Sequence, residues 1–189
     1  SRRQRQMCIR DSIERELKLL INEKVYNELL HSYDFHNPIT QTNTYFDTEN
    51  QDVKKQRGAV RIRTIQDKKI FTLKIRKDEY THYEFEKEIS AENINEIEDP
   101  EILNWFNQYQ IPKNLHPTAS FTTLRNVYAF ENGELCLDKT YYKNHTDYEI
   151  EYEYTSDHDG IHFFNSILEK YGLKWVKNCP SKIARALND

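Results

Sequence analysis

The sequence predicts an α+β fold in which eight antiparallel strands form one sheet or barrel and helices pack against it. Three observations predict this class. Thirteen Tyr and nine Phe favour strands, in a chain of which 31% is charged. Segments of alternating pattern are joined by short connections, which indicates an antiparallel meander. Four Gly and five Pro among 189 residues leave little room for a hinge, so a single domain is predicted.

The first half of the chain predicts five strands and one helix. Charged or polar residues alternate with apolar ones in each strand segment. The predicted helix at residues 22–33 has apolar residues at helical spacing, with Asn22 as its N-cap. Turns at residues 67–69 and 77–79 join neighbouring strands as hairpins, and a polar loop runs through Asp52. The predicted strands are residues 13–20, 40–47, 59–65, 70–76 and 81–89.

The second half predicts three strands and four helices. Two helices are expected at residues 91–98 and 101–109, and Pro100 suits the first position of the second one. Asn132-Gly133 lies between two segments of strand pattern, which is a strong signal for a tight hairpin. The remaining expected elements are strands at 119–130, 134–140 and 147–154 and helices at 161–171 and 181–187.

Residues 1–12 do not fit the rest of the chain. They are similar to translated sequencing-adaptor sequence, and we expect a disordered, non-native scar. The alternative is a genuine basic arm that contacts nucleic acid. Without the four Arg and one Asp of this segment, the formal charge changes from −4 to −7. Such an acidic domain binds the phosphate backbone of nucleic acids poorly, so no nucleic-acid partner is expected.

The remaining cysteines give no disulfide framework and no zinc site. Cys136 and Cys179 lie far apart and there is no CxxC motif, so a reducing, cytoplasmic location is expected. No apolar run approaches 18 residues and no secretory signal is visible. We therefore expect no membrane association.

The charged residues of the predicted strands gather on one face of each strand. Residues two apart in a strand share a face, so Glu14, Glu16 and Lys18 lie together, opposite Leu17 and Leu19. The later strands are sorted by sign: two carry only cations and two carry only carboxylates. Their residues are Arg61, Arg63, Lys74, Arg76, Glu84, Glu86, Glu88, Glu149, Glu151 and Glu153, with Arg125 and Asp138 on two further strands.

Two arrangements fit this pattern. An open antiparallel sheet would leave its charged face in water. Eight strands also suffice to close a barrel, and the separation of signs favours a function for the charged face. If that face points inward, the lumen needs water, metal ions and a polyanion, because unmatched buried charges are very costly.

The residue types indicate the ligands of such a lumen. Clustered carboxylates suit a hard divalent cation such as Mg²⁺ or Mn²⁺. Arg and Lys suit phosphate oxygens, which Arg binds in a two-pronged geometry. The sequence contains no glycine-rich phosphate loop. A complex of a metal with a polyphosphate is therefore the favoured ligand.

An ordered set of motifs resembles one known family over residues 13–189. Glu14-Arg15-Glu16-Leu17-Lys18 matches the ExExK signature of the CYTH domain, or triphosphate tunnel metalloenzyme, superfamily. The chain is similar to its stand-alone Gram-positive bacterial type, described as triphosphatase or adenylate cyclase-like. The further matches, in the family's order, are residues 43–48, Arg61-Ile62-Arg63, Thr72-Leu73-Lys74, Arg125, Asp138, the acidic run 149–153 and Ser181-Lys182.

The resemblance implies a closed, eight-stranded antiparallel β-barrel, or tunnel, with a charged lumen and helices outside, and a divalent-metal-dependent triphosphatase. It implies that Glu14, Glu16, Asp138, Glu151 and Glu153 bind Mg²⁺ or Mn²⁺. Glu149 shares their face and is the alternative if the register is shifted. The implied phosphate-binding residues are Lys18, Arg61, Arg63, Lys74, Arg76, Arg125 and Lys182, with Arg185 a weaker candidate and Glu84 and Glu86 orienting these cations.

The substrate and the reaction leave alternatives open. Inorganic triphosphate is the leading substrate, because no motif marks a pocket for a base or a thiazole ring; nucleoside and thiamine triphosphates are the others. An adenylyl cyclase would use the same tunnel, with attack by a ribose hydroxyl on the α-phosphate. A non-catalytic binder of polyphosphate or nucleotide is the third reading. A homodimer is an open alternative to a monomer.

Overall fold

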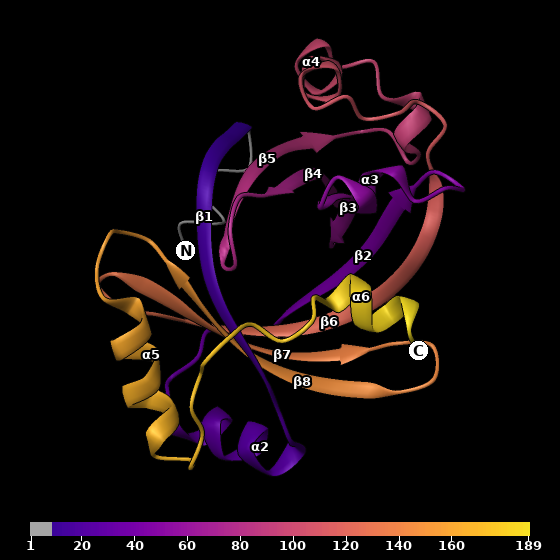
Figure 1. Ribbon diagram of the computed structural model, residues 1–189. Helices are drawn as coiled ribbons and strands as arrows, with labels where there is room; N and C mark the ends of the chain where they lie inside the picture. The colour runs from indigo at the N-terminus through magenta and orange to yellow at the C-terminus, as the bar shows by residue number, and fades with distance from the viewer. Residues whose placement is uncertain (1–8) are drawn as a thin grey trace.

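The computed structural model describes residues 9–189, and within them eight antiparallel strands close into a barrel (Figure 1). The order around the barrel is β1-β5-β4-β3-β2-β6-β7-β8. The predicted closed barrel is confirmed, and the open sheet is excluded. The strands are β1 Ile9–Ile21, β2 Ile39–Asp47, β3 Gly58–Ile65, β4 Lys68–Arg76, β5 Thr81–Ile89, β6 His116–Ala129, β7 Gly133–Tyr141 and β8 Thr146–Tyr154.

Strand β1 closes the barrel because it pairs with two different neighbours. Its first half lies against β5, where Arg15 is opposite Thr81, and its second half lies against β8, where Glu16 is opposite Glu153. The strand begins at Ile9, four residues earlier than predicted, and residues 9–12 pair with β5. The expected disorder of residues 9–12 is therefore wrong; residues 1–8 lie outside the described residues.

The helices lie outside the barrel. Asn22, Asp99, Asp159 and Ser181 act as N-caps, each accepting a hydrogen bond from the first turn of its helix. The helices are α2 Glu23–Ser32, α3 Asp52–Lys55, α4 Pro100–Gln108, α5 Gly160–Glu169 and α6 Lys182–Leu187, with the 3-10 turn η1 Ile94–Glu96.

Two helix predictions needed correction. Residues 91–98 form only the single turn η1 instead of a helix. The loop after β2 contains the unpredicted α3, which begins where the carboxylate of Asp47 accepts hydrogen bonds from Val53 N at 2.9 Å and Lys54 N at 3.1 Å. A side chain from the end of a strand thus stabilises the first turn of this helix.

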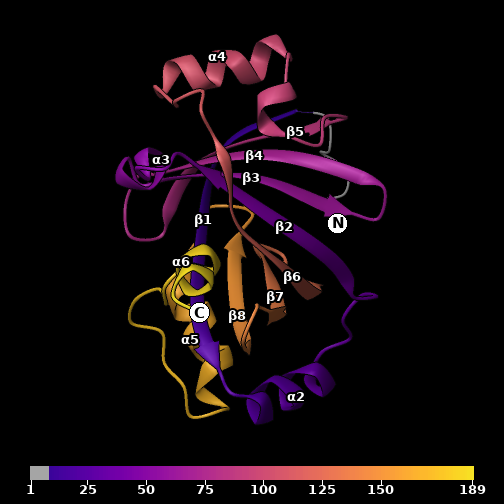
Figure 2. The ribbon, with the colours of Figure 1, turned by 90° about the vertical axis from the view of Figure 1, so that its right-hand side faces the viewer.

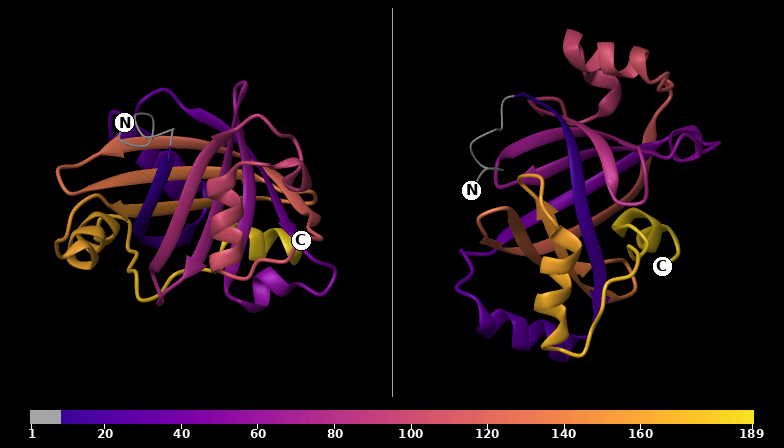
Figure 3. Two further views of the ribbon diagram at one scale, coloured as in Figure 1. Left: turned by 90° about the horizontal axis from the view of Figure 1, so that it is seen from above. Right: turned by 60° about the vertical axis from the view of Figure 1, so that its left-hand side comes forward.

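The apolar faces of the strands point outward and pack against the helices. One cluster joins β3, β4 and β5 to α4, through residues such as Phe71 and Trp105. The other joins β1, β7 and β8 to α2 and α5, through residues such as Leu17 and Phe164. Figures 2 and 3 show α4 on one side of the barrel and α2 and α5 on the other. The alternating charged faces are therefore left to line the interior.

The C-terminal helix α6 lies next to β6 (Figure 1). Its Lys182, Ile183 and Leu187 line the same cavity as the inward faces of the strands. None of the helices within residues 9–189 has the length and apolar character that a bilayer-spanning helix requires.

Candidate active site

The barrel encloses a charged cavity of about 1380 Å³. On β1, Glu14 and Glu16 are each 2% exposed and face this interior, whereas Leu17 packs outward against the helices. This alternation places the predicted charged face inside the barrel. Among the predicted site residues, the cavity is lined by Glu14, Glu16, Lys18, Arg61, Arg63, Lys74, Arg76, Arg125, Glu151 and Lys182.

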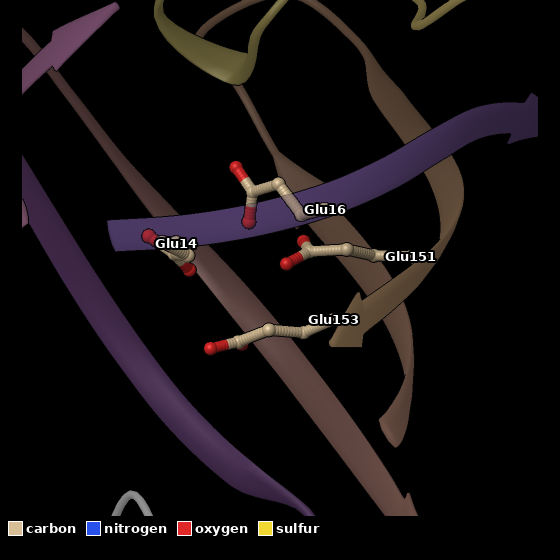
Figure 4. Close-up of side chains that lie close together, drawn as sticks. All are labelled: Glu14, Glu16, Glu151 and Glu153. Atoms are coloured by element: carbon tan, nitrogen blue, oxygen red, sulfur yellow. The ribbon is translucent and has the colours of Figure 1, made fainter. Parts of the chain in front are cut away.

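Four carboxylates meet where β1 lies beside β8. Glu14, Glu16, Glu151 and Glu153 each contribute an oxygen to a group whose atoms all lie within 4.8 Å of one another. Figure 4 shows the four side chains converging from the two strands. All four are buried. Like charges at this separation repel, so the group needs protons, cations or a metal ion.

A second group shares one residue with the first. Asp138 on β7 and Glu149 on β8 lie opposite each other, and Glu151 completes a set of three oxygens within 4.8 Å. Asp138 and Glu149 are both 0% exposed. Glu149, which was the alternative metal ligand for a shifted register, therefore belongs to this second group. Glu151 belongs to both groups and connects them.

Two lysines accompany the first carboxylate group. Lys74 Nζ lies 3.2 Å from an oxygen of Glu14, 3.2 Å from one of Glu16 and 3.5 Å from one of Glu84. Lys18 Nζ lies 3.0 Å from Glu16. Two predicted phosphate-binding cations thus lie next to the predicted metal ligands.

Three cations accompany the second group. Arg125 contacts Asp138 at 2.7 Å and Glu151 at 3.1 Å. From α6, Lys182 reaches Asp138 at 2.9 Å and also pairs with Glu149. Arg185, one turn further along the helix, binds Glu149 at 3.1 Å. The C-terminal helix is therefore joined to the lumen by ion pairs.

The two arginines of β3 lie three strands from β1 in the order around the barrel. Arg61 donates to Thr72 at 3.1 Å and lies 3.6 Å from Glu86. Its Nε is buried and has no hydrogen-bond partner among the described residues. Arg63 donates to Asn43 at 2.7 Å. A buried donor without a partner suits an oxyanion ligand.

Arg76 differs from the other predicted phosphate-binding residues. It lines the same cavity but is exposed, and its Nε donates to the backbone carbonyl of Asp78 at 3.1 Å. It therefore lies at the rim of the cavity rather than in its buried part.

Burial and neighbouring charges give the carboxyls different proton affinities. Burial, followed by the charges of Glu16 and Glu84, raises the pKa of Glu14 to about 8. Burial and Glu16 raise the pKa of Glu151 to about 7. Burial alone would also raise the pKa of Glu16, but Lys18 and Lys74 outweigh it and hold that pKa well below its usual range. At pH 7 and without metal, Glu14 therefore holds a proton while Glu16 is ionised.

Asp138 and Glu149 of the second group have lowered pKa values and are ionised. Burial opposes the charge of Asp138, but Arg125 and Lys182 outweigh it and lower the pKa of that carboxyl. The pKa of Glu149 is lowered in the same way, chiefly by Lys182 and Lys18 acting against burial. This group holds its charges through the cations that surround it.

Three interior residues were not predicted as part of the site. Glu134 is 4% exposed and lies opposite Glu153, two strand pairs from β1. Tyr45 lines the cavity, and its pKa is lowered because Arg61 and Arg63 outweigh the effect of burial. The third is His82, whose pKa burial and Lys74 lower to about 4, so it is neutral at pH 7. Glu134 lies an even number of residues before Asp138 on β7, so both side chains share one face of the strand. This spacing was the sequence signal that could have identified Glu134.

The donor set fits a divalent metal ion with a phosphate ligand. Carboxylate oxygens within 4.8 Å of one another provide the hard ligands that Mg²⁺ and Mn²⁺ prefer. Surrounding Lys and Arg provide charge-assisted donors for phosphate oxygens. Glu14, Glu16 and Glu151 line the same cavity as these cations, so one ligand can contact both kinds of group.

Comparisons with known proteins agree with this geometry. The family model of the CYTH domain matches residues 12–185. The chain is 30% identical over 149 residues to the Bacillus subtilis protein named "Putative triphosphatase YjbK", covering 77% of each chain.

Solved structures show the same fold. A Bacillus halodurans protein described as "a putative adenylate cyclase" has a TM-score of 0.81 and 29% identity, covering 93% of this chain and 97% of its own. The Hippeastrum protein described as "Putative adenylyl cyclase HpAC1" has a TM-score of 0.73 and 23% identity, covering 95% and 96%. By sequence and by fold, the chain belongs to the CYTH domain family.

Proposed function

We propose that the chain hydrolyses the terminal phosphoanhydride bond of a triphosphate with Mg²⁺ or Mn²⁺ bound in the lumen. The observation that carries this proposal is the convergence of buried carboxylates and cations on one cavity inside the barrel. The family membership and the name of the Bacillus subtilis relative support the same reaction. Cys136 and Cys179 form no disulfide within the described part of the chain, which favours a reducing compartment, and we place the reaction in the cytoplasm.

The carboxylates would hold the metal. Glu14, Glu16, Glu151 and Glu153 form the first candidate site, and Asp138 and Glu149 join Glu151 in the second. A bound divalent ion would neutralise phosphate oxygens and acidify a water molecule. Metal binding requires ionised carboxyls, so Glu14 and Glu151 give up their protons when the site is loaded.

The cations would bind the triphosphate oxygens. Lys18, Lys74 and Arg125 contact carboxylates of the two candidate sites, and Arg61 and Arg63 lie on β3. Their fixed positions stabilise charge that develops on the leaving diphosphate and on the transferred phosphoryl group. Lys182 lines the same cavity, and it would exchange its carboxylate partners Asp138 and Glu149 for phosphate oxygens.

The reaction needs no covalent enzyme intermediate. Water forms a bond to the terminal phosphorus, the bond to the bridging oxygen breaks, and diphosphate leaves with the electron pair. The proton of the water would pass to one of the carboxylates that line the lumen. Inorganic triphosphate carries the complete charged unit that these residues contact, and we propose that it is hydrolysed.

The experiment compares matched variants. Glu16→Gln should lower kcat/KM for tripolyphosphate about 100-fold, because it removes one buried carboxylate from the proposed metal site. Glu28→Gln makes the same change on the exposed face of α2 and should leave activity unchanged. Equal activity in both variants would refute the proposed site. Cyclic AMP formed from ATP, without phosphate release, would point to a cyclase.

A further inference from the structure

Strand β1 changes its neighbour in the middle of the proposed metal site. Its pairing with β5 ends where Arg15 is opposite Thr81, and its pairing with β8 begins where Glu16 is opposite Glu153. Past this point, the backbone groups of β1 that point away from β8 need partners other than β5, because an unpaired buried N–H or carbonyl is costly. These groups belong to residues 16–18, which carry two of the proposed site side chains.

The side-chain amide of Asn178 supplies these partners. Its Oδ1 accepts a hydrogen bond from the backbone N–H of Lys18 at 2.8 Å, and its Nδ2 donates to the backbone carbonyl of Glu16 at 3.1 Å. One amide thus satisfies an acceptor and a donor on either side of Leu17, as a residue of a neighbouring strand does in a ladder. The next residue, Cys179, donates its N–H to the carbonyl of Lys18 at 3.3 Å.

The segment between α5 and α6 holds this amide in place, and Figure 1 shows it crossing β1 before it reaches α6. Trp175 donates its indole N–H to Oδ1 of Asn178 at 2.9 Å. The indole is buried and lies against Tyr80, with ring centroids 6.0 Å apart. Asn165 on α5 fixes the backbone of Trp175 by accepting from its N–H at 2.7 Å. The amide of Asn178 is therefore anchored to the outer apolar cluster.

The two residues whose backbones Asn178 contacts have side chains in the proposed site. Glu16 contributes an oxygen to the first carboxylate group, and Lys18 Nζ lies 3.0 Å from Glu16. A shift of β1 at this point would change the spacing between Glu16 and the carboxylates of Glu151 and Glu153 on β8. Removing a contact that orients a metal ligand commonly weakens metal binding roughly 10- to 100-fold.

We propose that Asn178 is a positioning residue that fixes β1 against β8 and so directs Glu16 and Lys18 into the lumen. Without the amide, the Glu16 carbonyl and the Lys18 N–H lose these partners, and β1 moves more freely against β8. The segment that precedes α6 therefore contributes to metal binding without supplying a ligand. This inference rests on the proposed function, because it takes Glu16 as a metal ligand.

The test measures the Kd of Mn²⁺ by isothermal titration calorimetry, without substrate, in matched variants. Asn178→Ala should raise the Kd about tenfold, because Glu16 is held less firmly. Asn165→Ala is the control and should leave the Kd unchanged. Asn165 also hydrogen-bonds a backbone N–H and a backbone carbonyl of the same segment, but both belong to Trp175 rather than to β1.

Urea unfolding of the same variants separates positioning from stability. A purely structural role of Asn178 would lower the free energy of unfolding and leave the Kd of the folded chain unchanged. If Asn178→Ala does not fold, Asn178→Leu keeps the volume of the side chain and removes the same hydrogen bonds.

The outcomes distinguish this inference from the proposed function. An unchanged Kd in the Asn178 variant, or an equal rise in Asn165→Ala, overturns the positioning role alone. An unmodified chain that neither binds Mn²⁺ nor releases phosphate from tripolyphosphate overturns the proposed function, and the positioning role with it.

Discussion

The guanidinium of Arg125 donates two hydrogen bonds to the carboxylate of Asp138, at 2.8 Å from Nε and 2.7 Å from Nη2. Arg125 is 4% exposed and Asp138 is 0% exposed. The pair joins a predicted phosphate-binding residue to a predicted metal ligand. In the free protein the lumen therefore neutralises its own charges, and metal and substrate would exchange with these internal partners.

The first prediction concerns this pair. Asp138→Asn should lower the free energy of unfolding by about 3 kcal/mol, because a buried guanidinium loses its anionic partner. Asp157→Asn is the matched control, since Asp157 also binds an arginine, Arg15 at 2.9 Å, but is 89% exposed. Urea unfolding of both variants checks this. Equal free energies of unfolding for Asp138→Asn and Asp157→Asn would show that Asp138 does not stabilise the buried charge of Arg125.

The second prediction concerns phosphate recognition. Arg61→Ala should lower kcat/KM for tripolyphosphate about 100-fold, because a buried donor for the substrate oxygens is lost. Arg15→Ala removes an arginine from the outer face and should have no effect on activity. Steady-state phosphate release measures both. A fall of similar size in the two variants would argue against a specific contact.

The third prediction concerns metal binding. The four carboxylates of the first group repel one another, so Mg²⁺ or Mn²⁺ should stabilise the folded chain. At a metal concentration 100 times Kd the gain is about 2.7 kcal/mol. For a chain of this size that corresponds to a rise of roughly 5–10 °C in Tm.

The matched variant for metal binding is the double substitution Glu16→Gln with Glu153→Gln. It removes two of the four proposed ligands and should abolish the rise in Tm. Calorimetric scans with metal and with a chelator make the comparison. A rise in Tm that survives the double substitution would place the metal elsewhere.

The fourth prediction concerns pH in the absence of metal. The pKa of Glu14 is about 8 and that of Glu151 about 7, against an ordinary value of 4.5 for the unfolded chain. Between pH 6.5 and 8 the folded state thus binds more protons than the unfolded state. The free energy of unfolding should fall as pH rises, by at most about 1.4 kcal/mol per pH unit for each protonated carboxyl.

Metal should remove this pH dependence, because the bound ion takes the place of the protons. Urea unfolding at pH 6.5 and pH 8, in a chelator and in Mg²⁺, gives the two slopes. Stability that increases with pH in the chelator would contradict the raised pKa values. Glu14→Gln should flatten the metal-free slope.

Strand periodicity is local, so the sequence alone predicted which residues share the charged face of each strand. That this face points into a closed barrel was expected only from the family resemblance. Alternation alone places Glu14 and Glu16 on one face and Leu17 on the other, and this face lies inside. The register between distant strands is not local, so the pairing of Glu16 with Glu153 could only be expected from family resemblance. The metal and phosphate roles of these residues stay predictions.

Other features escaped prediction for identifiable reasons. Residues 91–98 have helical pattern but form only the turn η1, whose Ile94 is buried in the outer cluster. The start of α3 depends on Asp47, a side chain contributed by the preceding strand.

The most direct test of the central claim is phosphate release from tripolyphosphate by the purified chain. We predict release of orthophosphate in Mg²⁺ or Mn²⁺ and its loss in excess chelator, because the carboxylate groups of the lumen need the ion to act on the substrate. Phosphate release that is unaffected by the chelator, or no release with either metal, would contradict the account.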